Sequence, residues 1–250
     1  MIFIKKFIKM TKRNGEFDYN KWKRRKVDDG TWVEDDEFRK RTLLKKEREL
    51  KEFKRKWGFL DLKSHSLLSR RNIKNREIIL DCETTGFWNS DGIVELSLLE
   101  VVDKKLTGNY MHCLFNPVIE ISKGAETIHN LSNEDLKDKP LFEEKSEEII
   151  KFIGTSKMVA HNSNFDMRML NNELNRCGWE SYNSECFIDT LKMARLLYPD
   201  KKNTLDSLCE RLNVDNSKRK TTGKHNALDD TYLLFDVYKL LINQTGHKPR

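Results

Sequence analysis

The sequence of 250 residues predicts an α/β fold, a mixed sheet flanked by helices, with a basic and partly helical N-terminal extension. Two observations carry this prediction. Apolar runs at 78–81, 93–102 and 110–115 are separated by polar turn segments, which is typical of an antiparallel meander. After residue 140, helical patterns alternate with short strand patterns, so the sheet is expected to be mixed rather than purely antiparallel.

The elements expected after the meander share the spacing of amphipathic or buried segments. They are a helix over 141–153, a strand over 157–160, a helix over 165–177, a strand over 187–188, and helices over 189–197, 203–212 and 226–242. The segment 217–224 contains Ser, Thr, Gly and four basic residues, so it is predicted as a flexible basic loop.

Charge divides the chain into an extension over 1–75, a domain over 76–246 and a short tail over 247–250. The extension holds 24 Lys and Arg against 12 Asp and Glu, a net charge of +12. The remainder holds 23 against 28, a net charge of −5. An acidic domain that handles a polyanion needs metal ions or a basic attachment to attract it.

Within the extension, residues 1–36 are expected to be irregular and 61–75 to form a linker. A helix is predicted over 37–57, because Leu and aromatic residues recur there near heptad spacing among charged residues. That helix could be a solvated element, a nucleic-acid contact or a docking site for a partner, and the sequence leaves the three open.

The composition argues against a membrane or secreted protein. No segment approaches the roughly 20 consecutive apolar residues that span a bilayer. The five cysteines are odd in number and form no Cys-x-x-Cys pair, which is typical of reduced thiols rather than disulfides or a zinc site. We therefore expect a cytoplasmic protein without a membrane partner.

The segment 78–86 is an apolar strand that ends in Asp-Cys-Glu-Thr-Thr-Gly. Positions two apart on a strand point to the same face, so Asp81 and Glu83 lie side by side. Two carboxylates held that close repel each other, and a divalent cation relieves the repulsion. This pair is therefore a candidate half of a metal site.

Two later segments carry carboxylates at helix starts. Asp166 follows the strand at 157–160, where a helix N-terminus favours negative charge, although it could equally be a capping residue. His225 precedes Asp229 and Asp230 at the start of the last helix, and spacing alone does not decide which aspartate faces inward.

Together these residues predict a site for two divalent cations, Mg²⁺ or Mn²⁺. Such cations prefer oxygen ligands, and four carboxylates suit a pair of them about 3.5–4 Å apart, as used in displacement at phosphorus. A histidine, with an ordinary pKa of ~6.5, can take a proton from water near neutral pH. His225 is thus a candidate general base.

The motifs, in this order, resemble those of the DEDDh 3′–5′ exonucleases, most closely the epsilon proofreading subunits of bacterial DNA polymerase III. The resemblance extends from about residue 77 to about residue 246. The matching segments lie at 81–86, 107–109, 161–166, 188–190, 203–209, 215–219 and 225–230.

The resemblance implies a ribonuclease-H-like fold and His225 as the general base. It implies Asp230 rather than Asp229 as the last carboxylate of the site. The metal ligands implied are Asp81, Glu83, Asp166 and Asp230.

The resemblance also implies three contacts with the 3′-terminal nucleotide. Backbone amides around Thr84 would hold it, Phe165 would wall its pocket, and His129 would lie nearby. The activity implied is release of nucleoside 5′-monophosphates from single-stranded or frayed DNA 3′ ends during proofreading. A replicative DNA polymerase subunit is the candidate partner.

Two alternatives stay open. RNA-trimming exoribonucleases share the same five residues, and the readout of a 2′-hydroxyl is not visible in a sequence. A non-catalytic nucleic-acid-binding protein, driven by the basic extension, is the alternative outside enzymes.

Overall fold

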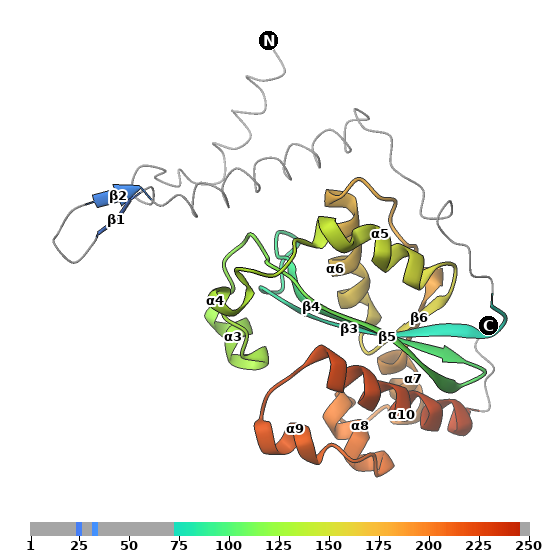
Figure 1. Ribbon diagram of the computed structural model, residues 1–250. Coiled ribbons are helices and arrows are strands. Elements are labelled where there is room, and N and C mark those ends of the chain that lie inside the picture. The colour runs from blue at the N-terminus through green and yellow to red at the C-terminus, as the bar shows by residue number, and fades with distance from the viewer. Residues whose placement is uncertain (1–23, 27–31, 35–72, 246–250) are drawn as a thin grey trace. The chain divides into compact units, whose positions relative to one another are not determined.

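The computed structural model describes residues 24–26, 32–34 and 73–245 (Figure 1). In the N-terminal part, β1 (Arg24–Lys26) pairs antiparallel with β2 (Trp32–Glu34). The expectation that residues 1–36 are irregular throughout is therefore wrong. An Asp-Gly pair at 29–30 between the two strands is a hairpin signal that the charge pattern of this segment obscured.

Three predicted features cannot be compared with the structure. The helix expected over 37–57, the linker expected over 61–75 except for its last three residues, and the tail at 247–250 lie outside the described residues.

The main domain is built on a mixed sheet of five strands in the order β5-β4-β3-β6-β7. β3 pairs antiparallel with β4, which pairs antiparallel with β5, whereas β6 lies parallel to β3 and β7 parallel to β6. The prediction of a mixed sheet is confirmed. The strands are β3 (Arg76–Thr84), β4 (Ile93–Val102), β5 (Lys105–Leu114), β6 (Lys157–Ala160) and β7 (Phe187–Asp189).

The hairpin between β4 and β5 is tighter than expected, so β5 begins at Lys105 rather than at residue 110. Only Asp103 and Lys104 connect the strands, with φ angles of 50° and 61°. Positive φ at both positions is the geometry of a type I′ turn, which matches the twist of the paired strands. The first half of β5 is exposed and polar, so it lacked the apolar pattern of a strand.

Helices cover both faces of the sheet (Figure 1). On one face lie α5 (Phe142–Ile153) and α6 (Ser163–Arg176). On the other lie α7 (Thr190–Leu197), α8 (Leu205–Leu212) and α10 (Ala227–Thr245). None of the helices in the described part of the chain is long and apolar enough to cross a membrane.

Four short helical segments were not predicted, because one or two turns show no usable periodicity. Two of them are capped by serines, and Ser132 with Asp135 forms a capping box. They are α3 (Lys123–His129), α4 (Asn133–Leu136), the 3₁₀ turn η2 (Ser184–Cys186) and α9 (Ser217–Thr222).

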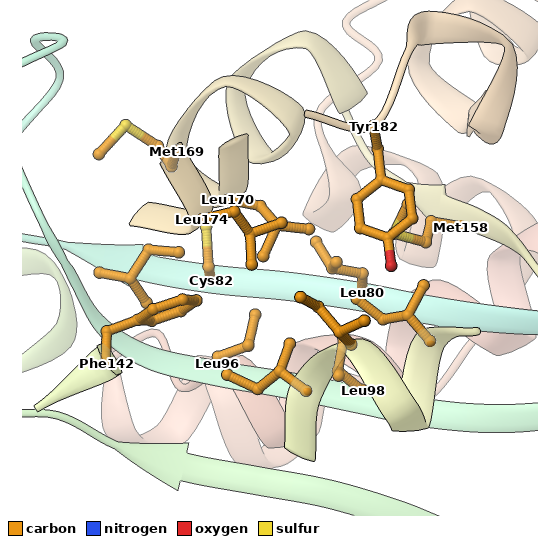
Figure 2. Close-up of a cluster of buried hydrophobic side chains, with 14 of the residues drawn as sticks. Leu80, Cys82, Leu96, Leu98, Phe142, Met158, Met169, Leu170, Leu174 and Tyr182 are labelled. Carbon is orange, nitrogen blue, oxygen red and sulfur yellow. The ribbon is translucent and has the colours of Figure 1, made fainter. Parts of the chain in front are cut away.

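The alternation of side chains along β3 decides which face each residue serves. Leu80 and Cys82 enter the apolar cluster beneath α5 and α6, where they meet Met158, Leu170 and Leu174 (Figure 2). Ile79 enters the opposite cluster, which α7, α8 and α10 cover. By the same alternation, the Asp and Glu of the Asp-Cys-Glu motif lie on the α10 side.

A buried ion pair ties the start of β3 to its neighbours. Arg76 Nε lies 2.5 Å from Glu100 Oε1 on β4, and its Nη1 and Nη2 donate to the carbonyl oxygens of Ile153 and Phe152 at the end of α5. Burial by itself would raise the pKa of Glu100, but hydrogen bonds from Asn109, Arg76 and a threonine outweigh it and lower the pKa to about 2.

We expect Arg76→Met to lower the free energy of unfolding by about 3–5 kcal/mol, because it leaves a buried carboxylate without its cation. Urea unfolding measures this change. Lys145→Met is the control, because Lys145 forms an exposed pair with Glu148, and it should change stability by less than about 1 kcal/mol. Equal effects of the two substitutions would contradict the structural role assigned to Arg76.

Candidate functional site

Four carboxylates and one histidine from three elements line one cavity of about 1050 Å³. The cavity opens at the carboxyl end of the parallel strands, where α/β sheets commonly bind ligands. Two of the carboxylates come from β3, one from the first turn of α6 and one from the first turn of α10, with the histidine just before α10. These residues are Asp81, Glu83, Asp166, Asp230 and His225.

A tight turn after β6 positions Asp166. Asn162 adopts a left-handed conformation with φ 68°, and its backbone N–H donates to Asp189 Oδ1 at 3.2 Å. The turn directs the chain straight into α6, so the helix begins at Ser163, two residues earlier than predicted. The Sγ of Cys82 then lies 3.4 Å from Asp166 Oδ1, which links α6 to β3.

The start of α10 decides between the two neighbouring aspartates. Asp229 is 38% exposed and pairs with Lys218 at 2.7 Å. Asp230 is 4% exposed and lines the cavity, whereas Asp229 does not. Asn226 fixes this arrangement, since its Oδ1 accepts from the N–H of Asp229 at 3.1 Å and its Nδ2 donates to Glu95 on β4 at 2.9 Å.

Burial raises the pKa of every carboxyl group in this set, and repulsion within the set adds to the rise for Asp81 and Glu83. The pKa of Asp81 rises well above its ordinary value through burial and then through the charges of Asp230, Asp166 and Glu83. Burial and the charge of Asp230 raise the pKa of Glu83 to about 8. Burial raises the pKa of Asp166 to about 7, and that of Asp230 to about 7 although Arg219 opposes it.

This donor set fits divalent cations. Closely spaced carboxylates that resist ionisation become favourable once a cation neutralises them. Potential ligand atoms of Glu83, His225 and Asp230 lie within 4.8 Å of one another, so these three alone could hold one ion. Asp81 and Asp166 add carboxylates to the same cavity, which is the hard-oxygen environment that Mg²⁺ and Mn²⁺ prefer.

Arg219 is a site residue that the sequence did not single out. Its guanidinium is largely buried and reaches three residues of the cavity wall. Nη1 lies 2.6 Å from Asp230 Oδ1, Nε lies 3.1 Å from Asp206 Oδ1, and Nη2 lies 2.8 Å from His225 Nδ1. Arg219 thus supplies positive charge among the carboxylates and holds α8, α9 and the start of α10 together.

The segment before His225 is not the flexible loop that was predicted, because residues 217–222 form α9. The backbone N–H of Ser217 donates to Asp215 Oδ1 at 2.9 Å at the start of this helix. Gly223 ends it with φ 64°, a left-handed conformation that favours glycine at helix ends. The glycine and threonines that suggested flexibility therefore belong to a single helical turn and its termination.

His225 is held from two sides. Its backbone N–H donates to Ile128 O on α3 at 3.0 Å, and its Nδ1 lies 3.6 Å from Asp230 Oδ2. Burial, followed by the nearby charge of Arg219, lowers the pKa of the imidazole. The ring is therefore neutral at physiological pH and can accept a proton.

Thr84 and His129 are joined to each other but are not among the residues that line the cavity. His129 Nδ1 accepts from the N–H of Leu131 at 3.1 Å, so a neutral ring carries its proton on Nε2 and donates it to Thr84 O, 3.2 Å away. The Thr84 hydroxyl donates to Gly86 O at 2.7 Å. Burial lowers the pKa of His129, consistent with the neutral form.

Phe165 lines the cavity beside Phe87, with ring centroids 6.1 Å apart. Phe87 is 63% exposed, so one aromatic wall of the cavity is open to solvent. Arg168 lies 5.4 Å over the ring of Phe165 and donates to Asn89 in the loop that carries Phe87. This wall can receive a planar ring by stacking.

Glu95 is a second residue beside the site that the sequence reasoning did not select. It lies opposite Glu83 in the register of β3 and β4, is almost completely buried, and contacts His112 as well as Asn226. A glutamate inside the apolar run 93–102 was a signal, because buried charges in strands need partners. Arg219 gave a weaker signal, since it lies in a run of basic residues that is typical of an exposed surface.

Comparison with known proteins identifies the family. The RNase T family model, described as an exonuclease family, matches residues 78–238, which is more than half of the chain. The chain belongs to the RNase T/DEDDh exonuclease family. Enzymes of this DEDDh family use divalent metal ions, and the predicted 3′–5′ exonuclease activity and ribonuclease-H-like fold are confirmed.

Two relatives show how similar the domain is to named members. The chain is 44% identical over 171 residues to the DNA polymerase III subunit epsilon of Rickettsia typhi, covering 66% of this chain and 73% of that protein. It is 39% identical over 176 residues to the subunit epsilon of Buchnera aphidicola subsp. Acyrthosiphon pisum, covering 67% and 73%. The predicted resemblance to epsilon subunits is confirmed.

Two solved exonuclease structures share the fold. Exonuclease X, solved in complex with 5′ overhanging duplex DNA, gives a TM-score of 0.53 at 28% identity and covers 69% of this chain and 95% of its own. E. coli Exonuclease I, solved with a dT13 oligonucleotide, gives a TM-score of 0.61 at 17% identity and covers 69% and 42%. The second likeness concerns the fold alone.

The raised carboxyl pKa values predict that the metal-free DEDDh domain loses stability as pH rises. Asp166 has a pKa of about 7 in the folded state and one of ~3.9 when unfolded. The free energy of unfolding is therefore highest below about pH 4, where this carboxyl group is protonated in both states, and it falls as pH rises through about 7. We expect Asp166→Asn in EDTA to be more stable than the wild type at pH 8, with the difference shrinking toward pH 4.

Urea unfolding at the two pH values measures this effect. Asp229→Asn is the matched control, because Asp229 lies outside the cavity and should gain no stability at pH 8. A stability difference for Asp166→Asn that is the same at both pH values would contradict the predicted titration.

Proposed function

We propose that this exonuclease removes nucleotides from the 3′ ends of single-stranded or frayed DNA and releases nucleoside 5′-monophosphates. The observation that carries the proposal is the meeting of four carboxylates, two of them buried and two half-buried, and one neutral histidine in a single cavity. The names of the relatives, DNA polymerase III subunit epsilon, support DNA replication as the setting.

The metal-binding role is assigned to the four carboxylates. Their burial and raised pKa values support this assignment, because a cation would remove the repulsion among them. Two cations, Mg²⁺ or Mn²⁺, would activate a water molecule and stabilise the charge on the leaving 3′ oxygen. The proposed ligands are Asp81, Glu83, Asp166 and Asp230.

His225 is proposed as the general base. It lies at the cavity beside Asp230 and is uncharged at neutral pH, so it can accept the proton of the attacking water. Arg219 Nη2 lies 2.8 Å from its Nδ1 and 2.9 Å from its Nε2, and this contact holds the ring beside Asp230.

The 3′-terminal nucleotide is proposed to lie between the carboxylates and the aromatic wall. Phe165 offers a face on which its base can stack. Backbone amides around Thr84 and the side chain of His129 are proposed as further contacts. The hydrogen bond from His129 to the carbonyl oxygen of Thr84 supports the proposal, because it fixes the end of β3 next to Glu83.

Proofreading in the cytoplasm, next to a replicative DNA polymerase subunit, is the proposed cellular role. The names of the relatives support this role. This chain covers about 73% of the length of the Rickettsia protein. Retention of the polymerase by the tagged full-length protein would test the partnership.

We expect Asp230→Asn to lower Mg²⁺-dependent hydrolysis of single-stranded DNA by on the order of 100- to 1000-fold, because it removes a proposed ligand of the cation that would stabilise charge on the reacting phosphate. DNA binding in EDTA should change little. Asp229→Asn is the matched control, since the neighbouring carboxylate lies outside the cavity and its loss should leave activity near that of the wild type. Full activity of Asp230→Asn would refute the site, and would favour a purely nucleic-acid-binding role.

We expect matched DNA and RNA oligonucleotides to be degraded at different rates, with DNA the faster. The measurement is the release of 5′-monophosphates from each strand under the same conditions. Faster degradation of RNA would replace proofreading with RNA trimming as the function.

A further inference from the structure

The cavity that holds the carboxylates extends to the segment between α7 and α8. This part of the wall is basic, with Arg195 on the last turn of α7 and Lys201 and Lys202 in the loop that follows. The volume of about 1050 Å³ reaches the upper limit of the roughly 300–1,000 Å³ that is typical of sites for one drug-sized molecule. The cavity therefore has room for more than the nucleotide at the carboxylates.

These three basic side chains are available to a ligand. All three are exposed, and within the described part of the chain none forms an ion pair with a carboxylate. Arg219 lines the same cavity but is engaged by Asp206 and Asp230. Residues 76–250 carry a net charge of −5, so unpaired cations on this wall contrast with the acidic domain around them.

The loop that carries the lysines is braced against the site. Lys202 O accepts from Arg211 Nη2 at 2.8 Å, and Asn203 Oδ1 accepts from Arg211 Nη1 at 3.0 Å. Asn203 Nδ2 donates to Tyr198 O at 2.9 Å, and Asn203 O lies 2.9 Å from Nε2 of His161, which follows β6. The backbone of the lysines is thus fixed relative to the turn that positions the α6 carboxylate.

We propose that Arg195, Lys201 and Lys202, which we call the α7–α8 rim, bind the phosphodiester groups on the 5′ side of the scissile bond in single-stranded DNA. This proposal rests on the proposed function. If the scissile phosphate lies at the carboxylates and the terminal base at the aromatic wall, the next phosphates need cationic partners elsewhere in the cavity. Lys and Arg are the usual partners of phosphate groups, and they hold a strand without reading its sequence.

Substrate length tests the rim, because only a substrate with more than one phosphodiester can reach it. The variant is Arg195→Gln/Lys201→Gln/Lys202→Gln in the full chain. The two substrates are single-stranded DNA and the nitrophenyl ester of thymidine 5′-monophosphate, which contains a single phosphodiester. We expect KM for DNA to rise about tenfold or more and its salt dependence to lose about two units of slope, at roughly 0.7 per lost contact. Hydrolysis of the ester and kcat on DNA should stay within about twofold of the wild type.

A second triple variant controls for overall charge. Lys145→Gln/Lys151→Gln/Lys239→Gln also removes three positive charges, but from α5 and α10, at positions outside the cavity. It should leave KM for DNA within about twofold of the wild type. An equal rise in KM for both triple variants would overturn the proposed role of the rim, because it would show that DNA binding responds only to the overall charge of the protein.

The remaining outcomes also decide whether the rim binds the strand. An unchanged KM for DNA in the rim variant, or an equal loss on DNA and on the ester, would overturn the proposal, since the rim would then be idle or would act at the scissile phosphate. If the wild type hydrolysed neither substrate, the proposed function would fail instead. In that case the salt slope of DNA binding in EDTA, measured by fluorescence anisotropy, would still decide whether the rim binds phosphate.

Discussion

Repulsion among the carboxylates gathered at the end of β3 is the constraint on which the rest of the structure depends. Asp81, Glu83, Asp166 and Asp230 meet in one cavity, and loss of solvation raises the pKa of each. Repulsion within the set adds to the rise for Asp81 and Glu83. Such an arrangement is unfavourable without a cation, so it must be stabilised by interactions elsewhere. The two apolar clusters on either face of the sheet, with the buried ion pair of Arg76, supply that stability.

The topology explains how sequence-distant residues reach one point. β3 carries two carboxylates by its alternation, and β6 lies parallel to it, so the turn after β6 opens at the same edge of the sheet. α10 packs against the face of the sheet on which the Ile79 side chain lies, and it begins beside that edge. Arg219 then links α9 to Asp206 and Asp230, and it moderates the negative charge.

The cavity has walls of three chemical kinds, and each suits a different part of a nucleic-acid end. The carboxylates suit cations at a phosphate, the pair Phe87 and Phe165 suits a base, and the basic α7–α8 rim suits further phosphates. This division accounts for how an acidic domain can handle a polyanion. Divalent cations would neutralise the carboxylates, and the α7–α8 rim offers basic side chains where the strand would leave the cavity.

The sequence by itself determined the mixed sheet, the family and the candidate carboxylates, because apolar alternation and motif order are local properties of the chain. It missed β1 and β2, the short helices and the early start of β5, since one-turn helices and exposed edge strands show no apolar period. Spacing alone left Asp229 and Asp230 open, and the family resemblance already implied Asp230. Only the tertiary structure showed that Arg219, Glu95 and the rim belong to the surroundings of the cavity. A charged side chain looks alike in sequence whether it is solvated or buried, and its partners come from elements far along the chain.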